Sequence, residues 1–423
     1  MNALVFPYIA KGSVTAPSSK SELHRLLIAS ALSENCTEIH CLETNDDIDA
    51  TVRCLKSLGA GITKTESGFS VVPVSKSGFH LSSVLDCGES GSTLRFMLPI
   101  AAAIGGSSFT GSGRLPERPI IHLIETLKAH GAIFSAEKLP FKVSGILSGG
   151  EYCIPGNVSS QYITGLMLAA PLIGKTVINV EGGLQSADYI QITADVMSRF
   201  GITVSISENI DKITINGNQK YKSPGIIESN GDWSASAFPM CLGALGGPVA
   251  VQGLSENTKQ GDRRIIDVLR KAGADVRIEN KKCIVKRKNL SGLTIDVSDI
   301  PDLVPAMAAL FMHAEGRTVF TNAERLCLKE SDRLSSTCNM VNALGGQAMI
   351  TGHSLCIDGS SDCTGGIVDG SGDHRIVMAA VIAASACKRQ STIIGVEAVS
   401  KSWPEFFDEM KTIGGKFDVV NVR

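Results

Sequence analysis

The chain has 423 residues, which is enough for two or three domains with a well-buried core. Apolar residues make up 43% and charged residues 19%, a balance that excludes a disordered protein. The formal net charge of −2 excludes binding to nucleic acid or an anionic membrane through overall charge. The 12 cysteines lack the spacing of a zinc or disulfide framework, and no secretory or transit signal or membrane-spanning run is recognisable. We therefore expect a cytoplasmic globular protein.

The chain is built from repeated units of about 70 residues. A glycine closes an amphipathic segment six times, as is typical of the C-terminal end of a helix. The glycines are Gly59, Gly131, Gly201, Gly273, Gly345 and Gly414. The amphipathic helices are predicted, in chain order, at 48–58, 120–130, 190–200, 265–272, 334–344 and 406–413. This regularity predicts six copies of one structural unit.

A second and more apolar helix is predicted before each amphipathic one. These helices are expected at 23–32, 94–104, 163–173, 235–245, 304–313 and 376–387. A helix that is apolar on nearly every face has to be buried. Alternating segments such as 202–206 and 212–216 follow the first five glycines and predict paired strands. Each unit is thus predicted to run strand, buried helix, strand, surface helix, strand, strand.

The sixth unit ends early, because only one strand is predicted after Gly414, at 416–422. The strand predicted at 4–10 could supply the missing one, so the N-terminus is expected to complete the C-terminal half. The six units then divide three and three. Residues 19–229 are predicted to form one domain, and residues 1–18 with 230–423 the other.

Basic side chains gather near the predicted helix starts. They are Lys20, Arg25, Arg95, Arg118, Lys329, Arg333, Arg375 and Lys401. Capping accounts for helix-start residues such as Asp46, Ser234 and Asp262, but a cation near a helix N-terminus is mildly unfavourable. The placement is reasonable if several phosphate or carboxylate groups bind there together with helix N–H groups. Asp302 and Glu330 stand among these cations, and each could be a counter-ion or a general acid or base.

These residues lie in segments that resemble the 3-phosphoshikimate 1-carboxyvinyltransferase (EPSP synthase) family of enolpyruvyl transferases. The resemblance covers nearly the whole chain, and includes Ser-Ser-Gln at 159–161 and Lys-Glu-Ser-Asp-Arg at 329–333. Its other segments are 16–21 with Arg25, 88–95, 114–119, 231–235, 300–302, 373–375 and 400–404. It implies an α/β fold of two domains, an inside-out α/β barrel of six βαβαββ repeats with three in each domain. Substrates would bind in the cleft between the domains.

The resemblance also implies a reaction. The enolpyruvyl group of phosphoenolpyruvate would pass to the 5-hydroxyl of shikimate 3-phosphate by addition and elimination, without a metal or an organic cofactor. This is a step of the shikimate pathway to chorismate and the aromatic amino acids, and the target of glyphosate. The implied enzyme is expected to act as a monomer.

The resemblance assigns roles residue by residue. The implied catalytic residues are Asp302, Glu330 and Lys20. Shikimate 3-phosphate would bind to Lys20, Ser21, Arg25, Ser159, Ser160, Gln161, Ser186, Tyr189, Asp302, Arg325 and Lys329. Phosphoenolpyruvate would bind to Lys20, Gly91, Arg118, Gln161, Arg333, Arg375 and Lys401. The chain departs from the usual family pattern at Glu89, Ser92, Phe96 and Arg325.

Two other functions have to be weighed. The UDP-N-acetylglucosamine enolpyruvyl transferases share the implied fold and donor, but they usually carry a catalytic cysteine in a loop that corresponds to 111–119, where this chain has none. A non-catalytic relative that binds sugar phosphates is the second alternative. The presence of Lys20, Asp302 and Glu330 argues against it.

Overall fold

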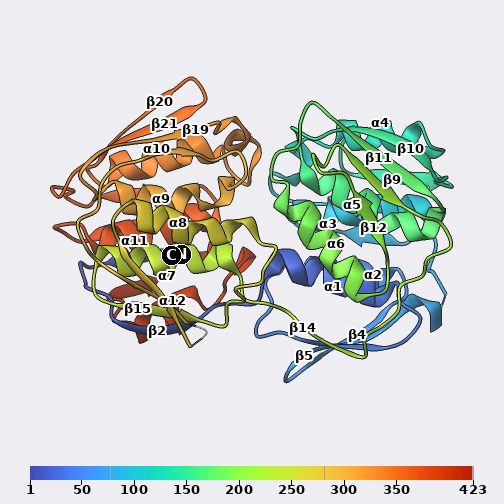
Figure 1. The fold of residues 1–423 in the computed structure, drawn as a ribbon, viewed down its shortest axis with the longest axis horizontal. Helices are drawn as coiled ribbons and strands as arrows, with labels where there is room; N and C mark the ends of the chain where they lie inside the picture. Colours follow the sequence, from blue (N-terminus) through green and yellow to red (C-terminus); the bar gives the residue numbers. More distant parts are fainter. Residues whose placement is uncertain (77, 281, 422–423) are drawn as a thin grey trace. The chain divides into compact units, whose positions relative to one another are not determined.

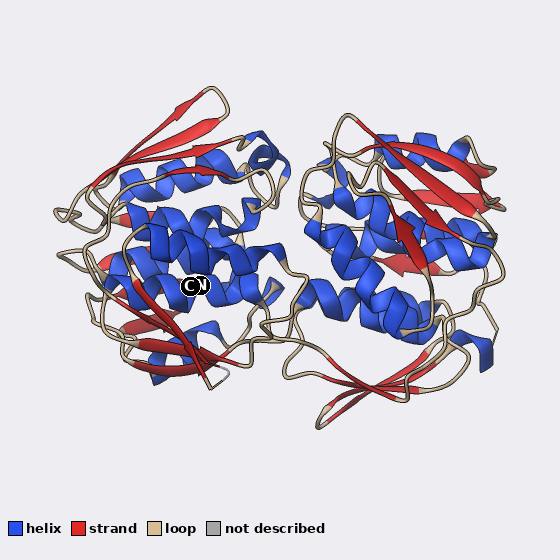
Figure 2. Cartoon of the chain, viewed as in Figure 1, coloured by secondary structure: helices blue, strands red, loops and turns tan. Residues whose placement is uncertain are grey.

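The computed structural model of the chain describes residues 1–76, 78–280 and 282–421. The chain divides into two compact units. Unit 1 comprises Met1–Pro17 and Gly231–Arg423, and unit 2 comprises Ser18–Asn230. Each unit has its own hydrophobic core. Figure 1 gives the course of the chain, and Figure 2 shows helices in the middle of each unit with strands toward its outer edges.

Unit 2 contains six α-helices among the described residues. They are α1 (Lys20–Ala31), α2 (Asp46–Ser57), α3 (Gly91–Ala103), α4 (Ile121–Lys128), α5 (Ser160–Ile173) and α6 (Asp188–Arg199). Its strands are β3 (Thr37–His40), β4 (Gly61–Thr65), β5 (Gly68–Val72), β6 (Val84–Asp86), β7 (Gly106–Thr110), β8 (Ala132–Phe134), β9 (Phe141–Gly145), β10 (Gly150–Pro155), β11 (Thr176–Glu181), β12 (Val204–Ile206), β13 (Lys212–Ile215) and β14 (Ile226–Glu228). They form three four-stranded sheets, ordered β14-β3-β5-β4, β6-β7-β9-β8 and β10-β11-β13-β12.

Unit 1 repeats this plan. Its α-helices are α7 (Trp233–Leu245), α8 (Ile265–Lys271), α9 (Val304–Phe311), α10 (Arg333–Ala343), α11 (His374–Ser385) and α12 (Phe406–Thr412). Its strands are β1 (Asn2–Val5), β2 (Gly12–Thr15), β15 (Val249–Gln252), β16 (Asp275–Glu279), β17 (Lys282–Lys286), β18 (Thr294–Asp296), β19 (Gly316–Thr321), β20 (Gln347–Thr351), β21 (Ser354–Gly359), β22 (Ile367–Asp369), β23 (Ser391–Ile394) and β24 (Phe417–Val420). The sheets are ordered β16-β17-β15-β2, β18-β19-β21-β20 and β22-β23-β1-β24.

The order of elements confirms the predicted α/β fold of six βαβαββ repeats. The strands of the described residues form six separate four-stranded sheets and no closed strand barrel. The odd-numbered helices are the buried ones, and all 12 residues of α11 are buried. The amphipathic helix α2 buries only Ile48, Ala50, Thr51, Cys54 and Leu55, which lie on one face.

Helix starts are the main local difference from the sequence prediction. Helix α1 begins at Lys20 rather than at residue 23, and α5 begins at Ser160 rather than at residue 163. The first turn of each helix is polar, so it carries no hydrophobic period to mark it. Serine caps begin these helices instead: the side chains of Ser19 and Ser159 accept backbone N–H groups of the first turn.

Two strands are exchanged between the first and fourth repeats. Strand β2 opens the first repeat but pairs in parallel with β15 of unit 1. Strand β14 opens the fourth repeat but pairs in parallel with β3 of unit 2. The exchange is the reason the chain passes between the units twice, at Pro17–Ser18 and at Asn230–Gly231.

The N-terminal strand completes the sheet of the last repeat. Strand β1 pairs antiparallel with β23 and with β24. It starts earlier than the predicted strand at 4–10 and is shorter. It ends before Pro7, which lacks the N–H group that would continue the ladder. The predicted last strand at 416–422 is observed as β24, and Val422 lies outside the described residues.

Candidate active site

The predicted site residues fall into two groups, one in each unit, and both lie at the N-terminal ends of helices. In unit 2, Ser19 caps α1, Asn45 caps α2, Ser90 caps α3 and Ser159 caps α5. Capping was predicted at Asp46, but the cap of α2 is the preceding residue, Asn45, whose side chain accepts from the N–H of Ile48. These caps bring Lys20, Ser21, Gly91, Ser160 and Gln161 to helix starts.

Arg25 lies on the second turn of α1 and is 1% exposed. Its Nε donates to Thr193 Oγ1 at 2.8 Å and its Nη2 to Thr164 Oγ1 at 3.2 Å. Nη2 also donates to the carbonyl of Tyr189, and Nη1 to the carbonyl of Ser21. Burial lowers the pKa of Arg25 to about 10, so the guanidinium is still charged at neutral pH. All these acceptors are uncharged.

The ring of Phe96 covers this guanidinium. The Arg25 Cζ atom lies 4.9 Å from the centroid of the Phe96 ring, within the range of a cation–π interaction. Phe96 is one of the departures from the family pattern, and here its aromatic face contacts a predicted substrate ligand.

Gln161 is held by two neighbours on α3. Its Oε1 accepts from Arg95 Nη1 at 2.6 Å, and its Nε2 donates to Ser92 Oγ at 2.8 Å. Arg95 also donates to the carbonyl of Pro119 at 3.1 Å. Because both ends of the amide have fixed partners, its orientation is set, and Arg95 links it to the segment that carries Arg118.

Gly91 provides room for the Arg118 side chain. A Cβ atom on Gly91 would lie 2.7 Å from Arg118 Nη1, closer than carbon and nitrogen can approach. The glycine therefore fits a point of close approach, but the group it makes room for is a predicted anion ligand. The nearby Glu89 carboxyl group lies against Gly113.

Lys20 and Ser186 complete the predicted residues of unit 2. Lys20 Nζ forms an ion pair with Asp47 Oδ2 at 2.8 Å. Ser186 has a φ angle of 57°, a left-handed conformation that is uncommon outside glycine and that concentrates at functional positions. It is 2% exposed and lies two residues before α6, next to the N-cap residue Ala187. Its carbonyl accepts from the N–H of Tyr189, which ties both residues to the helix start.

In unit 1 the predicted residues cluster around Asp302, in the turn before α9. Asp302 Oδ1 accepts from Lys329 Nζ at 2.9 Å and from Arg333 Nη1 at 2.8 Å. Arg375 Nη2 lies 3.6 Å from Asp302 Oδ2, and Arg375 Nη1 donates to the Asp302 carbonyl. Burial alone would raise the pKa of Asp302, but Arg375, Lys329 and Arg333 hold it well below its ordinary value. Burial lowers the pKa of Lys329 despite its pairing with Asp302.

Arg333 is the centre of this cluster and contacts three carboxylates. Besides Asp302, it pairs with Glu330 and with both oxygens of Asp373, at 2.9 and 3.2 Å. Although burial disfavours the charge, Asp373, Glu330 and Asp302 raise the pKa of Arg333. The helix-start segment Asp-His-Arg at 373–375 was part of the sequence argument, but Asp373 itself was not predicted as a site residue. An aspartate at a helix start is usually a cap, and Asp373 does cap α11.

Asp262 is a second residue that sequence reasoning misplaced. It was assigned to capping, but no side chain caps the 3₁₀ turn Gly261–Arg264 that contains it. Instead, its buried carboxyl group accepts a hydrogen bond from Ser234, which was also assigned to capping, although Asp232 is the cap of α7. Burial, with a smaller contribution from Asp302, raises the pKa of Asp262 to about 7.

The two remaining predicted residues lie close to this cluster. Lys401 Nζ donates at 2.9 Å to the carbonyl of Gly372, the residue before Asp373. Arg325 belongs to the 3₁₀ turn Glu324–Leu328 and contributes a positive potential at Lys329. Unit 1 therefore brings Asp302, Lys329, Glu330, Arg333 and Arg375 into one network, with Arg325 and Lys401 beside it.

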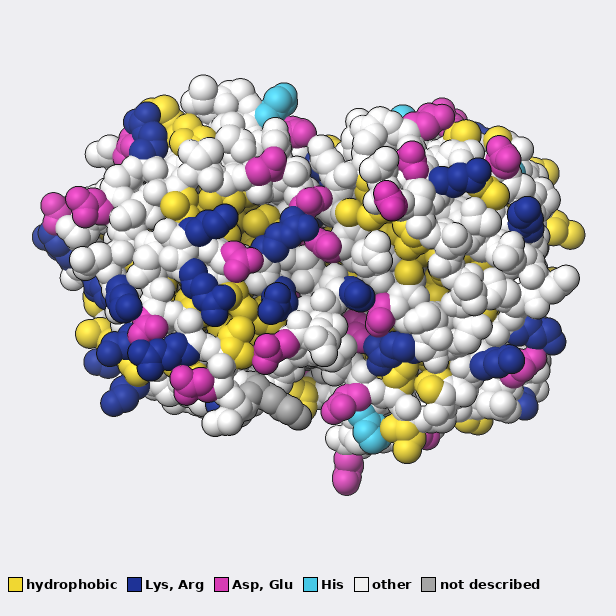
Figure 3. All heavy atoms as spheres, in the orientation of Figure 1, with side chains coloured by type: hydrophobic (Ala, Val, Ile, Leu, Met, Phe, Trp, Pro, Cys, Tyr) yellow, Lys and Arg dark blue, Asp and Glu magenta, His cyan; other side chains and the backbone are white. Residues whose placement is uncertain are grey.

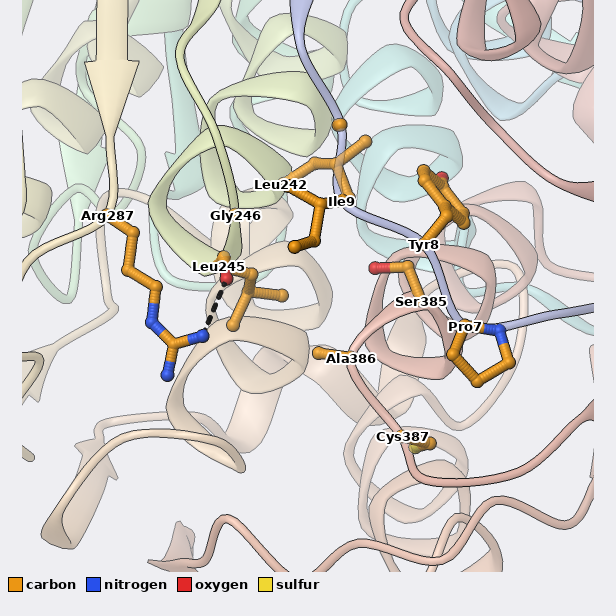
Figure 4. A pocket seen from close by; sticks show the side chains of 11 residues that line it. Pro7, Tyr8, Ile9, Leu242, Leu245, Gly246, Arg287, Ser385, Ala386 and Cys387 are labelled. Atoms are coloured by element: carbon orange, nitrogen blue, oxygen red, sulfur yellow. Dashed lines mark hydrogen bonds between the residues drawn. The ribbon is translucent and has the colours of Figure 1, made fainter.

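Two hollows in unit 1 lie at the opposite ends of the buried helices. One of about 330 Å³ is lined by Pro7–Ala10, the C-terminal ends of α7 and α11, and Arg287, which donates to the Leu245 carbonyl (Figure 4). A second, of about 610 Å³, shares Leu245, Arg287 and Ala386 with it. Neither hollow is lined by a predicted site residue. The predicted residues of this unit lie instead near the N-terminal ends of its helices.

Other kinds of site receive no support from the described residues. They contain no group of three or more His, Cys, Asp and Glu side chains arranged to hold a metal ion. No helix in the described part of the chain is long and apolar enough to cross a membrane. Acidic and basic side chains are mixed over the face of each unit displayed in Figure 3.

Comparisons with known proteins identify the family that the chain resembles. Residues 8–410 match the family model "EPSP synthase (3-phosphoshikimate 1-carboxyvinyltransferase)". The 3-phosphoshikimate 1-carboxyvinyltransferase of Clostridium kluyveri is 39% identical over 424 residues, covering 97% of each chain. That of Clostridium botulinum is 37% identical and covers 99% of this chain and 98% of its own. The solved EPSP synthase of Acinetobacter baumannii superimposes with a TM-score of 0.85 at 25% identity, covering 99% of this chain and all of its own.

Proposed function

This chain belongs to the EPSP synthase (3-phosphoshikimate 1-carboxyvinyltransferase) family, and we propose that its two residue groups carry out that reaction as follows. The enolpyruvyl group of phosphoenolpyruvate is transferred to the 5-hydroxyl of shikimate 3-phosphate. The hydroxyl oxygen bonds to C2 of phosphoenolpyruvate while C3 takes up a proton. Phosphate then leaves C2 and C3 loses a proton, which gives 5-enolpyruvylshikimate 3-phosphate and phosphate.

The observation that carries the proposal is the position of Asp302 among three cations. Its carboxylate contacts Lys329 and Arg333 and lies 3.6 Å from Arg375. Such a carboxylate is a weak base while the cations face it alone. When the phosphate and carboxylate of phosphoenolpyruvate share Arg333 and Arg375, the attraction on Asp302 weakens and its pKa rises. Asp302 is then able to take the proton of the 5-hydroxyl.

The other residues hold the substrates and handle the carbon-bound proton. Glu330, with Lys20, is assigned the protonation and deprotonation of C3. The shikimate 3-phosphate ligands are Lys20, Ser21, Arg25, Ser159, Ser160, Gln161, Ser186, Tyr189, Asp302, Arg325 and Lys329. The phosphoenolpyruvate ligands are Lys20, Gly91, Arg118, Gln161, Arg333, Arg375 and Lys401. Fixed cations of this kind stabilise the negative charge of the tetrahedral intermediate without having to reorganise.

Phosphate release tests the proposal directly. With both phosphoenolpyruvate and shikimate 3-phosphate the chain should release phosphate, and omission of either substrate should abolish release. Turnover with UDP-N-acetylglucosamine in place of shikimate 3-phosphate would assign the chain to the other enolpyruvyl transferases. Binding of shikimate 3-phosphate without release would assign it to the non-catalytic relatives.

The proposal also includes the setting in which the enzyme works. It acts as a monomer in the cytoplasm. Size-exclusion chromatography with light scattering should give a mass close to 44.6 kDa. A mass of twice that value would contradict the monomer.

A further inference from the structure

Among the site residues of unit 2, Arg25 is unusual because most of its N–H groups already donate to atoms of the protein. An arginine has five N–H groups. Four of those of Arg25 donate within the protein, to Thr193, Thr164, Tyr189 and Ser21. Within the described part of the chain, one N–H group, on Nη1, is left for a ligand. The direction in which that group points depends on the atoms that hold the rest of the guanidinium.

Two buried threonines hold the opposite edge of the guanidinium. Thr164 lies on α5 and Thr193 on α6, and both side chains are inaccessible to solvent. Their hydroxyl oxygens are 3.0 Å apart. Thr193 also donates to the carbonyl of Tyr189 at 2.7 Å, so its oxygen is free to accept from Arg25 Nε and from the Thr164 hydroxyl. Each hydrogen of this network therefore has one consistent acceptor.

We propose that Thr164 and Thr193 are positioning residues that aim the remaining Nη1–H group of Arg25 at an anionic group of shikimate 3-phosphate. Neither hydroxyl touches the substrate, and both act through the guanidinium. Because the threonines stand on α5 and α6 while Arg25 stands on α1, the network also ties together the starts of the three helices that carry the predicted shikimate 3-phosphate ligands of unit 2. This inference rests on the proposed function and names the residues that orient Arg25, one of the proposed substrate ligands.

Replacement of the hydroxyl by a methyl group tests the inference. Thr193→Val keeps the branched shape of the side chain but leaves the Nε–H group of Arg25 without its acceptor, so the guanidinium turns toward another one. The KM for shikimate 3-phosphate should rise about tenfold or more, since a misdirected charge-assisted hydrogen bond has that effect. The KM for phosphoenolpyruvate and kcat should each change less than about threefold.

Two further variants separate positioning from packing. Thr193→Ser restores the hydroxyl and should return the KM for shikimate 3-phosphate to within about threefold of wild type. Thr176→Val is the matched control, because Thr176 is equally buried in unit 2 and bonds to the carbonyl of Gly174. It should lower Tm about as much as Thr193→Val while leaving both KM values unchanged. Thr164→Val removes the 3.2 Å bond from Arg25 Nη2 and the 3.0 Å bond to Thr193 but keeps the acceptor of Arg25 Nε, and it replaces Thr193→Val if that variant folds poorly.

The outcomes separate this inference from the proposed function. A normal KM for shikimate 3-phosphate in Thr193→Val, or equal losses in the Val and Ser variants, would overturn the positioning role. Arg25→Ala serves as the reference for the proposed function itself. If Arg25→Ala raises that KM and Thr193→Val does not, only the inference fails. If the wild-type chain releases no phosphate, the proposed function fails. If Arg25→Ala binds shikimate 3-phosphate normally, the assignment of Arg25 as a substrate ligand fails.

Discussion

Each unit has one arginine among its site residues that is almost fully buried, and these two arginines have opposite surroundings. Arg25 of unit 2 and Arg333 of unit 1 are both 1% exposed. Arg25 donates to hydroxyl and carbonyl oxygens, and burial lowers its pKa. Arg333 pairs with Asp302, Glu330 and Asp373, which raise its pKa against the effect of burial.

The difference shows two ways to prepare a cation for an anionic ligand. The charge of Arg25 has no carboxylate partner among the described residues, so an arriving anion supplies the compensation and gains the full interaction. The charge of Arg333 is already compensated by carboxylates of its own unit. An anion that binds there has to compete with them, and this competition changes the basicity of the carboxylates. The first arrangement suits binding, and the second suits proton transfer.

The largest effect should come from the carboxylates that pair with Arg333 in unit 1. Asp302→Asn should lower kcat by about 10²–10⁴-fold, because the amide cannot accept the proton of the 5-hydroxyl. Glu330→Gln should lower kcat by a similar factor, because the amide cannot give a proton to C3 or take one from it. Phosphate release at saturating substrates measures both, with Asp267→Asn, an exposed carboxylate of α8, as the control. A wild-type kcat in either variant would remove that residue from the mechanism.

Loss of the two arginines should destabilise the protein by different amounts. Arg333→Met removes the cation that three carboxylates share, leaves the buried Asp373 carboxylate without its guanidinium partner, and should cost about 3–5 kcal/mol. Arg25→Met leaves only neutral acceptors, two of which are hydroxyls that can bond to each other, and should cost about 1–3 kcal/mol. Unfolding in urea, followed by a signal from each unit, compares the two. Equal losses in the free energy of unfolding would mean that charged partners stabilise a buried arginine no more than neutral ones do.

The pH dependence of stability should report the ionisation of Asp262. Its folded pKa of about 7 is higher than the unfolded value, so the protonated form stabilises the fold. That stabilisation is complete below about pH 4 and is lost as pH rises through about 7. Asp262→Asn should therefore gain Tm relative to wild type by a few degrees between pH 5 and pH 8. A difference in Tm that stays constant with pH, as expected for the exposed control Asp267→Asn, would contradict this.

The smallest effect should come from a hydrogen bond with an uncharged donor in the cluster around Arg333. Ser331 Oγ donates to Asp373 Oδ2 at 3.0 Å, but Arg333 also bonds to that oxygen. Ser331→Ala should cost about 1 kcal/mol, because the carboxylate keeps its stronger partner. A cost as large as that of Arg333→Met would mean that Asp373 is held mainly by the hydroxyl group.

Much of the fold follows from short-range patterns along the chain. Glycines such as Gly59 and Gly201 end the amphipathic helices, and the all-apolar segments are the buried helices, as predicted. The cations at helix starts, such as Lys329, Arg333 and Arg375, also lie in one network, as their common position in the repeats suggested.

The partners of these residues could not be predicted in the same way, because they come from other repeats. Arg25 meets Thr193 across 168 positions, and Arg333 meets Asp373 across 40. A threonine inside a helix or an aspartate at a helix start has a common local explanation, so neither stands out. The sheet partners of β2 and β14 were not predicted for a related reason: each strand has three or four residues, and pairing in either sheet satisfies its pattern.

The strand exchange links the order of synthesis to the order of folding. Unit 2 is completed only by β14, the last of its strands to be made, so it can close before unit 1 exists. Strand β2 is made early, but its partner β15 follows about 230 residues later, a wait of roughly 10–50 seconds at ~5–20 residues per second. Strand β1 waits longer still, for β23 and β24. Strands β1 and β2 are therefore made before their partners and pair late, and the carboxylate network of unit 1 takes shape only as the last repeat arrives.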